Sequence, residues 1–296
     1  MASLKEVRNR ITSVSSTQQI TSAMKMVSAA KLRRAQDAIV QMRPYADKLK
    51  EILENLSSSL GSSDSAFSKK REVKKVLLVV ITSNRGLCGG FNANVIKRTV
   101  RLANNEYKNH KVSLLCIGKK GTDFFKKNNY PFFDGTLAKE ISSLFDHVTF
   151  EHIAPIAEAT MNAFLASEFD KVELIYNQFK NAAVQVTVTE QFLPVMPAET
   201  LHSTSKKKHI TDYIFEPDKE FIVKDLIPRS LKTQFYKAIL DSHASEHGAR
   251  MTAMHKATDN AKDILRNLKL TYNKARQAAI TNEILEIVGG AEALKG

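Results

Sequence analysis

The sequence predicts an α/β protein that combines a long antiparallel coiled coil, made by the N- and C-terminal helices, with a three-layer Rossmann-like α/β domain. Apolar residues recur at spacings of three and four through both ends of the chain, as in heptad-repeat helices. Between the ends, short strand-like runs alternate with helical stretches, which indicates a mainly parallel sheet. We expect an N-terminal helix, a linker, the α/β domain and a C-terminal helix at residues 1–56, 57–74, 75–209 and 210–296.

The amino-terminal helix is predicted from sixteen heptad positions between Leu4 and Leu56, of which twelve are apolar. A helix of this length spans about 80 Å. Pro44 lies inside it and removes one backbone hydrogen bond, so we expect a bend there rather than an end. The serine-rich stretch that follows, Ser57 to Ser65, is typical of a linker.

Four neighbouring heptad positions in this helix are polar: Gln18, Thr21, Lys25 and Ser28. Four apolar residues leave the seam in the same stretch: Ile20, Ala23, Met24 and Val27. We interpret the stretch as a second face that is turned outward to a partner. The alternative is a loosely packed segment of coil whose polar residues only set the register.

The central segment predicts four strands, Val76–Ile81, Val112–Ile117, Val172–Tyr176 and Val184–Phe192. It predicts three helices, Asn92–Asn105, Thr122–Asn128 and Ile153–Ser167. The carboxy-terminal helix is expected from about Pro228 to Val288, and its apolar stripe steps by one residue between Ala279 and Ile280, which is a stutter. The two long helices most simply pair with each other, although pairing between copies of the chain is the open alternative.

Composition narrows the class of protein. The net charge of +13 favours an acidic partner but does not identify it. No apolar run approaches the roughly 20 residues of a membrane span, and the charged amino terminus does not resemble a signal peptide, so a soluble or peripheral protein is expected. The two cysteines, Cys88 and Cys116, form no ligand pattern, which argues against a disulfide or zinc framework.

Two glycine-containing loops are weak candidates for phosphate binding. The loop from Ser83 to Phe91 has glycines at 86, 89 and 90, which do not fit the dinucleotide spacing, and the stretch from Gly118 to Thr122 does not fit a P-loop. Structural turns are favoured over anion sites in both. Arg85 is interpreted as a contact to a partner, and Cys88 as a small buried residue rather than a nucleophile.

Two further patterns offer alternatives. His243 and His247 match the H-x-x-E-H pattern of inverted zinc peptidases, but such a site needs a third ligand and a pocket, so no metal or cofactor is predicted. A basic cluster lies on the first helix, and it fits either a solvated helix face or an acidic partner. It consists of Lys25, Lys31, Arg33 and Arg34. Stacking aromatics are missing around it, which disfavours nucleic acid.

Longer motifs at both ends resemble the gamma subunits of rotary ATP synthases. At the amino end they are Ile11-Thr-Ser-Val14, Thr17-Gln-Gln-Ile-Thr-Ser-Ala-Met-Lys-Met-Val27 and Ala30-Lys31. The loop Ser83 to Gly90 resembles a loop of the same family, with Asn84 in place of its usual Asp. At the carboxy end they are Arg250-Met-x-Ala-Met254, Ala257-Thr-Asp-Asn260, Asn273-Lys-Ala-Arg-Gln-Ala278 and Ile280-Thr-x-Glu283 to Gly290-Ala291. Between about residues 95 and 240 the likeness is one of plan only.

The resemblance implies a non-catalytic shaft, one copy per three alpha and three beta subunits, with an epsilon subunit and a membrane rotor ring at its foot. Residues that would contact the catalytic ring are Met24, Lys25, Arg33, Arg250, Arg276, Gln277, Thr281, Ile284, Ile287, Val288 and Leu294. Residues that would contact the foot and epsilon are Arg85, Ala35 and Met42. No homo-oligomer and no nucleic acid are expected. Plastid relatives carry an added cysteine pair for redox control, which is not found here.

The same resemblance implies a peripheral position on the cytoplasmic face of a bacterial plasma membrane, with a processed organellar chain as the open alternative. Two other functions compete with the shaft. One is a basic coiled-coil protein that binds nucleic acid, and the other is a zinc or nucleotide enzyme that turns over substrate alone.

Overall fold

The computed structural model describes residues 4–59, 66–68, 71–133, 144–145, 148–195 and 219–293. Its two longest elements are the helices α1 (Leu4–Ser59) and α5 (Lys219–Ala293). The chain divides into two compact units, a two-helix unit of residues 1–28 with 250–296 and an α/β unit of residues 29–249. Within the described ranges, no helix is long and apolar enough to cross a membrane.

The α/β unit is built on a four-stranded sheet of order β2-β1-β3-β4. Its strands are β1 (Lys75–Ile81), β2 (Lys111–Ile117), β3 (Lys171–Phe179) and β4 (Gln185–Leu193). β1 pairs in parallel with β2 and with β3, whereas the edge strand β4 runs antiparallel to β3. Because β1 is central, each of its residues from Val76 to Ile81 is fully buried, as the continuous apolar run predicted.

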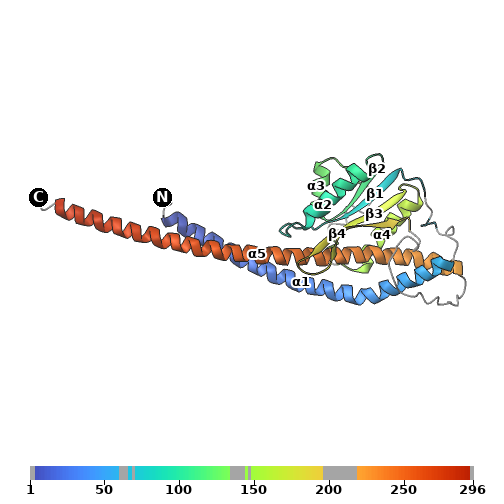
Figure 1. The fold of residues 1–296 in the computed structure, drawn as a ribbon, viewed down its shortest axis with the longest axis horizontal. Helices are drawn as coiled ribbons and strands as arrows, with labels where there is room; N and C mark the ends of the chain where they lie inside the picture. The colour runs from blue at the N-terminus through green and yellow to red at the C-terminus, as the bar shows by residue number, and fades with distance from the viewer. Residues whose placement is uncertain are drawn as a thin grey trace. The chain divides into compact units, whose positions relative to one another are not determined.

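Helices cover both faces of this sheet, which confirms the predicted three layers (Figure 1). On one face, α2 (Phe91–Arg101) and α3 (Lys119–Lys127) bury Val95 and Phe125 against alternate residues of β1 and β2. On the other face lie α4 (Phe150–Leu165) and a part of α5, whose Phe235 stacks edge-on against Phe192 of β4. The sheet therefore has two separate apolar cores.

The parts of α1 and α5 that belong to the α/β unit are packed differently. α1 buries one stripe there, made by Leu32, Ala35, Ile39 and Leu49. α5 is buried on all sides from Ala244 to Ala249, a stretch that includes Ser245, Glu246 and His247. Such complete burial is typical of a helix enclosed by other elements rather than one resting on a surface.

Several predicted elements need correction at their ends. α1 passes through Pro44 without ending, as expected, but stops at Ser59, three residues into the expected linker. The helix expected at 92–105 ends at Arg101 and continues as one π-helical turn, η1 (Leu102–Glu106). α5 starts nine residues before Pro228, so this proline lies inside the helix and not at its beginning. The expected boundary at residue 209 falls outside the described residues.

Candidate interface on the two-helix unit

The two-helix unit is an antiparallel pair. Thr258 of α5 donates a hydrogen bond to Thr21 of α1 over 2.9 Å, and Arg8 donates one to the hydroxyl of Tyr272 over 2.8 Å. The Arg8 guanidinium also lies 5.8 Å from the centre of the Tyr272 ring. A step of 13 residues back along α1 therefore matches a step of 14 residues forward along α5. The pairing lies within one chain, as the simpler interpretation predicted.

The two-helix unit buries small hydroxylated side chains together with the apolar residues Val7, Met254 and Ala261. Thr21, Ser28 and Thr258 are buried, with exposed fractions of 9%, 2% and 8%. Their hydroxyls have partners on their own helices, since the hydroxyl of Ser28 bonds the carbonyl of Met24 over 2.7 Å and Thr21 bonds that of Gln18 over 3.0 Å. Satisfied hydroxyls avoid the cost of burying an unpaired polar group. The bond between Thr258 and Thr21 joins the two helices and therefore specifies their register.

Apolar side chains on this part of α1 face outward. Ile20 and Val27 are 59% and 58% exposed, as the interpretation of a second face required, and Met26, which it did not include, is 65% exposed. Met24 is half-buried. A cluster of exposed large apolar residues on a helix indicates a surface that binds another protein.

The far end of α5 extends past its partner helix. The register places Leu4, the first described residue of α1, opposite a residue near 276 of α5. Residues 277–293 of α5 then continue for about 25 Å beyond the described part of α1. Five large apolar side chains in this stretch are 47–71% exposed: Ile280, Ile284, Leu285, Ile287 and Val288. Four of them follow helical spacing on one face, so they form an apolar stripe that no other described residue covers.

The predicted contacts to a catalytic ring lie in several environments. Arg276, Gln277 and Thr281 are exposed on α5, where Thr281 bonds the carbonyl of Gln277 over 2.9 Å. Lys25 is half-buried, Arg33 is exposed on α1, and Arg250 is only 7% exposed. Leu294 lies outside the described residues. Among the described members of the set, Arg250 is therefore the one whose side chain is mostly buried within this chain.

The three residues predicted for the foot all lie in the α/β unit. Arg85 is exposed in the loop after β1, Met42 is half-buried on α1, and Ala35 is 5% exposed within the buried stripe of α1. Arg85 is therefore more accessible to another subunit than Ala35 is.

The loop after β1 is held closed by its own side chains. Asn92, in the first turn of α2, accepts a hydrogen bond from the backbone N–H of Ser83 over 2.9 Å and donates to the Ser83 hydroxyl over 2.8 Å. It also donates to the sulfur of Cys88 over 3.2 Å, and Cys88 is 2% exposed. This geometry is that of a structural turn, which is the favoured interpretation of the sequence.

The second glycine motif also has a packing explanation. Gly118 has a φ of +105°, and a Cβ there would lie 2.0 Å from the carbonyl oxygen of Thr82. Gly121 approaches the same residue, since its N–H bonds the Thr82 hydroxyl over 2.9 Å. Asn84 accepts a hydrogen bond from the backbone N–H of Lys119 over 3.0 Å, so the residue that departs from the family pattern caps α3. The two glycines therefore allow the start of α3 to lie close to Thr82 at the end of β1.

The two histidines of the zinc-like motif do meet. Their Nε2 atoms are 3.2 Å apart and their rings are nearly perpendicular, while Phe145 stacks on His243 at 6.3 Å. However, no group of three or more His, Cys, Asp or Glu side chains suited to a metal occurs among the described residues. The motif therefore lacks, in the described part of the chain, the third ligand of a zinc peptidase.

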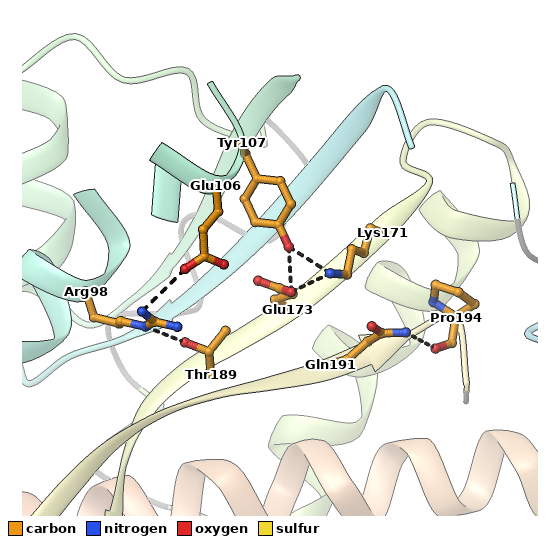
Figure 2. Close-up of polar contacts among 8 residues, drawn as sticks. All are labelled: Arg98, Glu106, Tyr107, Lys171, Glu173, Thr189, Gln191 and Pro194. Carbon is orange, nitrogen blue, oxygen red and sulfur yellow. Dashed lines mark hydrogen bonds and ion pairs between the residues drawn. The ribbon is translucent and has the colours of Figure 1, made fainter. Parts of the chain in front are cut away.

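A buried polar cluster that no sequence pattern predicted lies between the end of η1 and β3 (Figure 2). Tyr107 donates to Glu173 over 2.6 Å, and Lys171 lies 2.8 Å from both the Glu173 carboxylate and the Tyr107 hydroxyl. Burial, followed by the bond to Glu173, raises the pKa of Tyr107 to about 12. Burial lowers the pKa of Lys171, but its bonds to Glu173 and Tyr107 outweigh this, so that pKa is raised.

Known proteins with similar sequences identify the class of protein. A family model described as ATP synthase matches residues 3–294. The ATP synthase gamma chain of Flavobacterium johnsoniae is 63% identical over all of both chains, and that of Cytophaga hutchinsonii is 56% identical over 99% of each. The chain belongs to the ATP synthase gamma chain family.

Solved structures agree with the fold. A chain from the central stalk and c-ring of Tetrahymena thermophila mitochondrial ATP synthase is 27% identical, with a TM-score of 0.57 over 80% of this chain and 99% of the other. A chain from the Euglena gracilis mitochondrial ATP synthase rotor is 21% identical, with a TM-score of 0.63 over 94% of this chain and 98% of the other. The gamma chain of an ATP synthase is the central rotor shaft of its catalytic sector. The nucleic-acid alternative finds no support in these comparisons.

Proposed function

We propose that this chain, as that shaft, is non-catalytic and turns inside a ring of three alpha and three beta subunits, with one copy per ring. Its foot would rest on a membrane rotor ring, with an epsilon subunit alongside, at the cytoplasmic face of a bacterial plasma membrane. The observation that carries the proposal is the apolar stripe on α5 beyond its pairing with α1, which no other residue in the described ranges covers. An apolar sleeve inside the ring would cover that stripe.

The two-helix unit suits the transmission of torque. Two helices held along one seam resist twisting better than a single helix does. Contacts along the shaft must break at every step, which favours many weak ones. Arg276, Gln277 and Thr281 are exposed, and exposed ion pairs and hydrogen bonds are worth about 0.2–1 kcal/mol each. They are therefore proposed as ring contacts together with Met24, Lys25, Ile284, Ile287 and Val288.

The experiment is reconstitution of the ATP synthase in sealed vesicles, from this chain with the alpha and beta subunits and the membrane rotor ring and stator of the same organism. It compares the wild type with Ile284→Asn/Ile287→Asn/Val288→Asn. Because these side chains are exposed, the isolated variant should keep the helix content and melting temperature of the wild type. The assembled complex of the variant should still contain this chain, alpha subunits and beta subunits in a 1:3:3 ratio, but it should lose most of its rotation-coupled ion pumping. Val184→Asn, which replaces a residue 48% exposed in the α/β unit, is the control.

Three results would contradict the proposal. They are an unchanged coupling in the triple variant, a complex without the expected ratio, or turnover of ATP by the chain on its own.

A further inference from the structure

The positive charge of this chain is concentrated on one layer of the α/β unit. Residues 91–129, which hold α2, η1, β2 and α3, contain nine Lys and Arg but only two acidic residues, a net charge of +7 out of the +13 of the whole chain. Eight of the nine are exposed. Apart from Lys111 at the start of β2, the exposed ones lie on α2, on α3 and in the turn after η1: Lys97, Arg101, Lys108, Lys119, Lys120, Lys126 and Lys127. We call these seven residues the basic layer.

The basic layer is not neutralised within the described part of the chain. None of its seven side chains forms an ion pair there, whereas Arg98, which is half-buried beside them, pairs with Glu106 over 3.5 Å and donates to Thr189 over 3.0 Å (Figure 2). Lys97 and Arg101 are one helical turn apart, which places like charges side by side at a cost to the helix.

The amino end of α3 shows the same imbalance. Its first turn carries Lys119 and Lys120 and no acidic residue, although the helix dipole disfavours cations at this end. The backbone N–H of Lys119 is already capped by Asn84, so the lysines are not needed to satisfy it. Lys126 and Lys127 add two more charges at the other end, with Phe124 39% exposed between the two pairs. An anion outside the chain would relieve this unfavourable arrangement.

We propose that the basic layer binds the anionic headgroups of a phospholipid membrane. Six of its seven cations are lysines, which act as point charges and do not need the planar, paired acceptors that arginine prefers. A fluid anionic surface can bring a headgroup to each of them. Single-stranded nucleic acid would want several exposed aromatic rings for stacking, and Phe124 is the one large aromatic side chain exposed in this layer. This inference goes beyond the proposed shaft role and does not depend on it.

The test is flotation of the full-length chain with phosphatidylcholine vesicles, with and without phosphatidylglycerol, at low and high salt. The wild type should bind only the anionic vesicles, and high salt should release it. Changing Lys97, Lys119, Lys120, Lys126 and Lys127 to Gln should weaken binding by about 100-fold or more, since each lysine near an anionic surface contributes substantially. Circular dichroism checks that the exposed substitutions leave the fold intact, and the Lys126→Gln/Lys127→Gln double variant should show an intermediate loss.

A matched variant removes five exposed lysines from elsewhere: Lys5, Lys256, Lys262, Lys269 and Lys274, each changed to Gln. It has the same net charge as the first variant, and its binding should fall by less than about 5-fold. Equal losses in the two variants would show that only net charge matters and would overturn the proposal. Failure of the wild type to bind anionic vesicles would also overturn it, as would binding of duplex DNA or an acidic polypeptide through the same lysines without any binding of vesicles.

Discussion

Oxidative crosslinking of Thr21→Cys with Thr258→Cys tests the antiparallel seam directly. The two hydroxyl oxygens are 2.9 Å apart, so sulfur atoms at these positions need only a small shift to bond. The residues are 237 positions apart in sequence, and closing a loop of that length stabilises the folded chain by about 5 kcal/mol at most. The native Cys88 and Cys116 are buried and do not compete. We expect an intramolecular disulfide, seen as faster migration without reductant.

The control pair, Thr21→Cys with Leu265→Cys, moves one cysteine seven residues along α5. This shift is about 10 Å along the helix axis, and disulfides do not form when the Cα atoms are more than about 7 Å apart. The control should therefore remain reduced, and the oxidised first pair should still support ATP hydrolysis after assembly, because both helices belong to one shaft. Covalent dimers from the first pair, or equally fast closure of the control, would refute the antiparallel pairing within one chain.

Three further predictions concern stability. Tyr107→Phe should lower the free energy of unfolding by about 1–3 kcal/mol at neutral pH, because it removes the hydrogen bond to the buried Glu173. The pKa of Tyr107 is raised from 10.0 to about 12, so the stabilisation by Tyr107 is full below pH 10 and is lost as the pH rises towards 12. Denaturant titrations should therefore show the stabilities of the two proteins converging near pH 12. Gly118→Ala should destabilise the chain by more than about 3 kcal/mol through its clash with Thr82, whereas Gly289→Ala, with open space around it in α5, should raise the melting temperature slightly. Asp170→Ala should lower the free energy of unfolding by about 1–3 kcal/mol, because the Asp170 carboxylate accepts hydrogen bonds from the backbone N–H groups of Lys74 and Lys75 at 2.9 Å each. Burial raises the pKa of Asp170, but those bonds outweigh burial and leave the pKa lowered. The stabilisation by Asp170 is therefore present above about pH 4 and fades on acidification, which a comparison of acid unfolding curves will show.

Much of the fold follows from periodicity. The heptad spacing from Leu4 predicted α1, and the run from Val76 to Ile81 predicted a strand buried on both faces. The ends of elements were less accessible because they depend on single contacts. α3 begins at Lys119 rather than Thr122 because Gly118 turns the chain against Thr82 and Asn84 caps the new helix, and neither contact leaves a pattern in the local sequence.

The buried cluster around Glu173 shows a second limit. Glu173 interrupts an otherwise apolar strand, and Lys171 lies two residues earlier on the same face, so the pair alone was visible in the sequence. Tyr107 lies 66 positions from Glu173 and reaches it only because η1 ends beside the start of β3. Long-range polar contacts of this kind can be predicted only when the topology is known, and the composition of the sequence does not provide it.

The composition of the seam explains how one chain can be both a paired helix and a surface for partners. A seam made only of leucines would bury more apolar area, but it would lack a hydrogen bond that selects one register. With Thr21 and Thr258 in the seam, the hydrogen bond between them fixes the register, while Ile20, Met26 and Val27 are exposed. These apolar side chains remain exposed in the isolated chain. A large part of the stability of the helix pair should therefore come from assembly with a partner that covers them, rather than from the isolated chain.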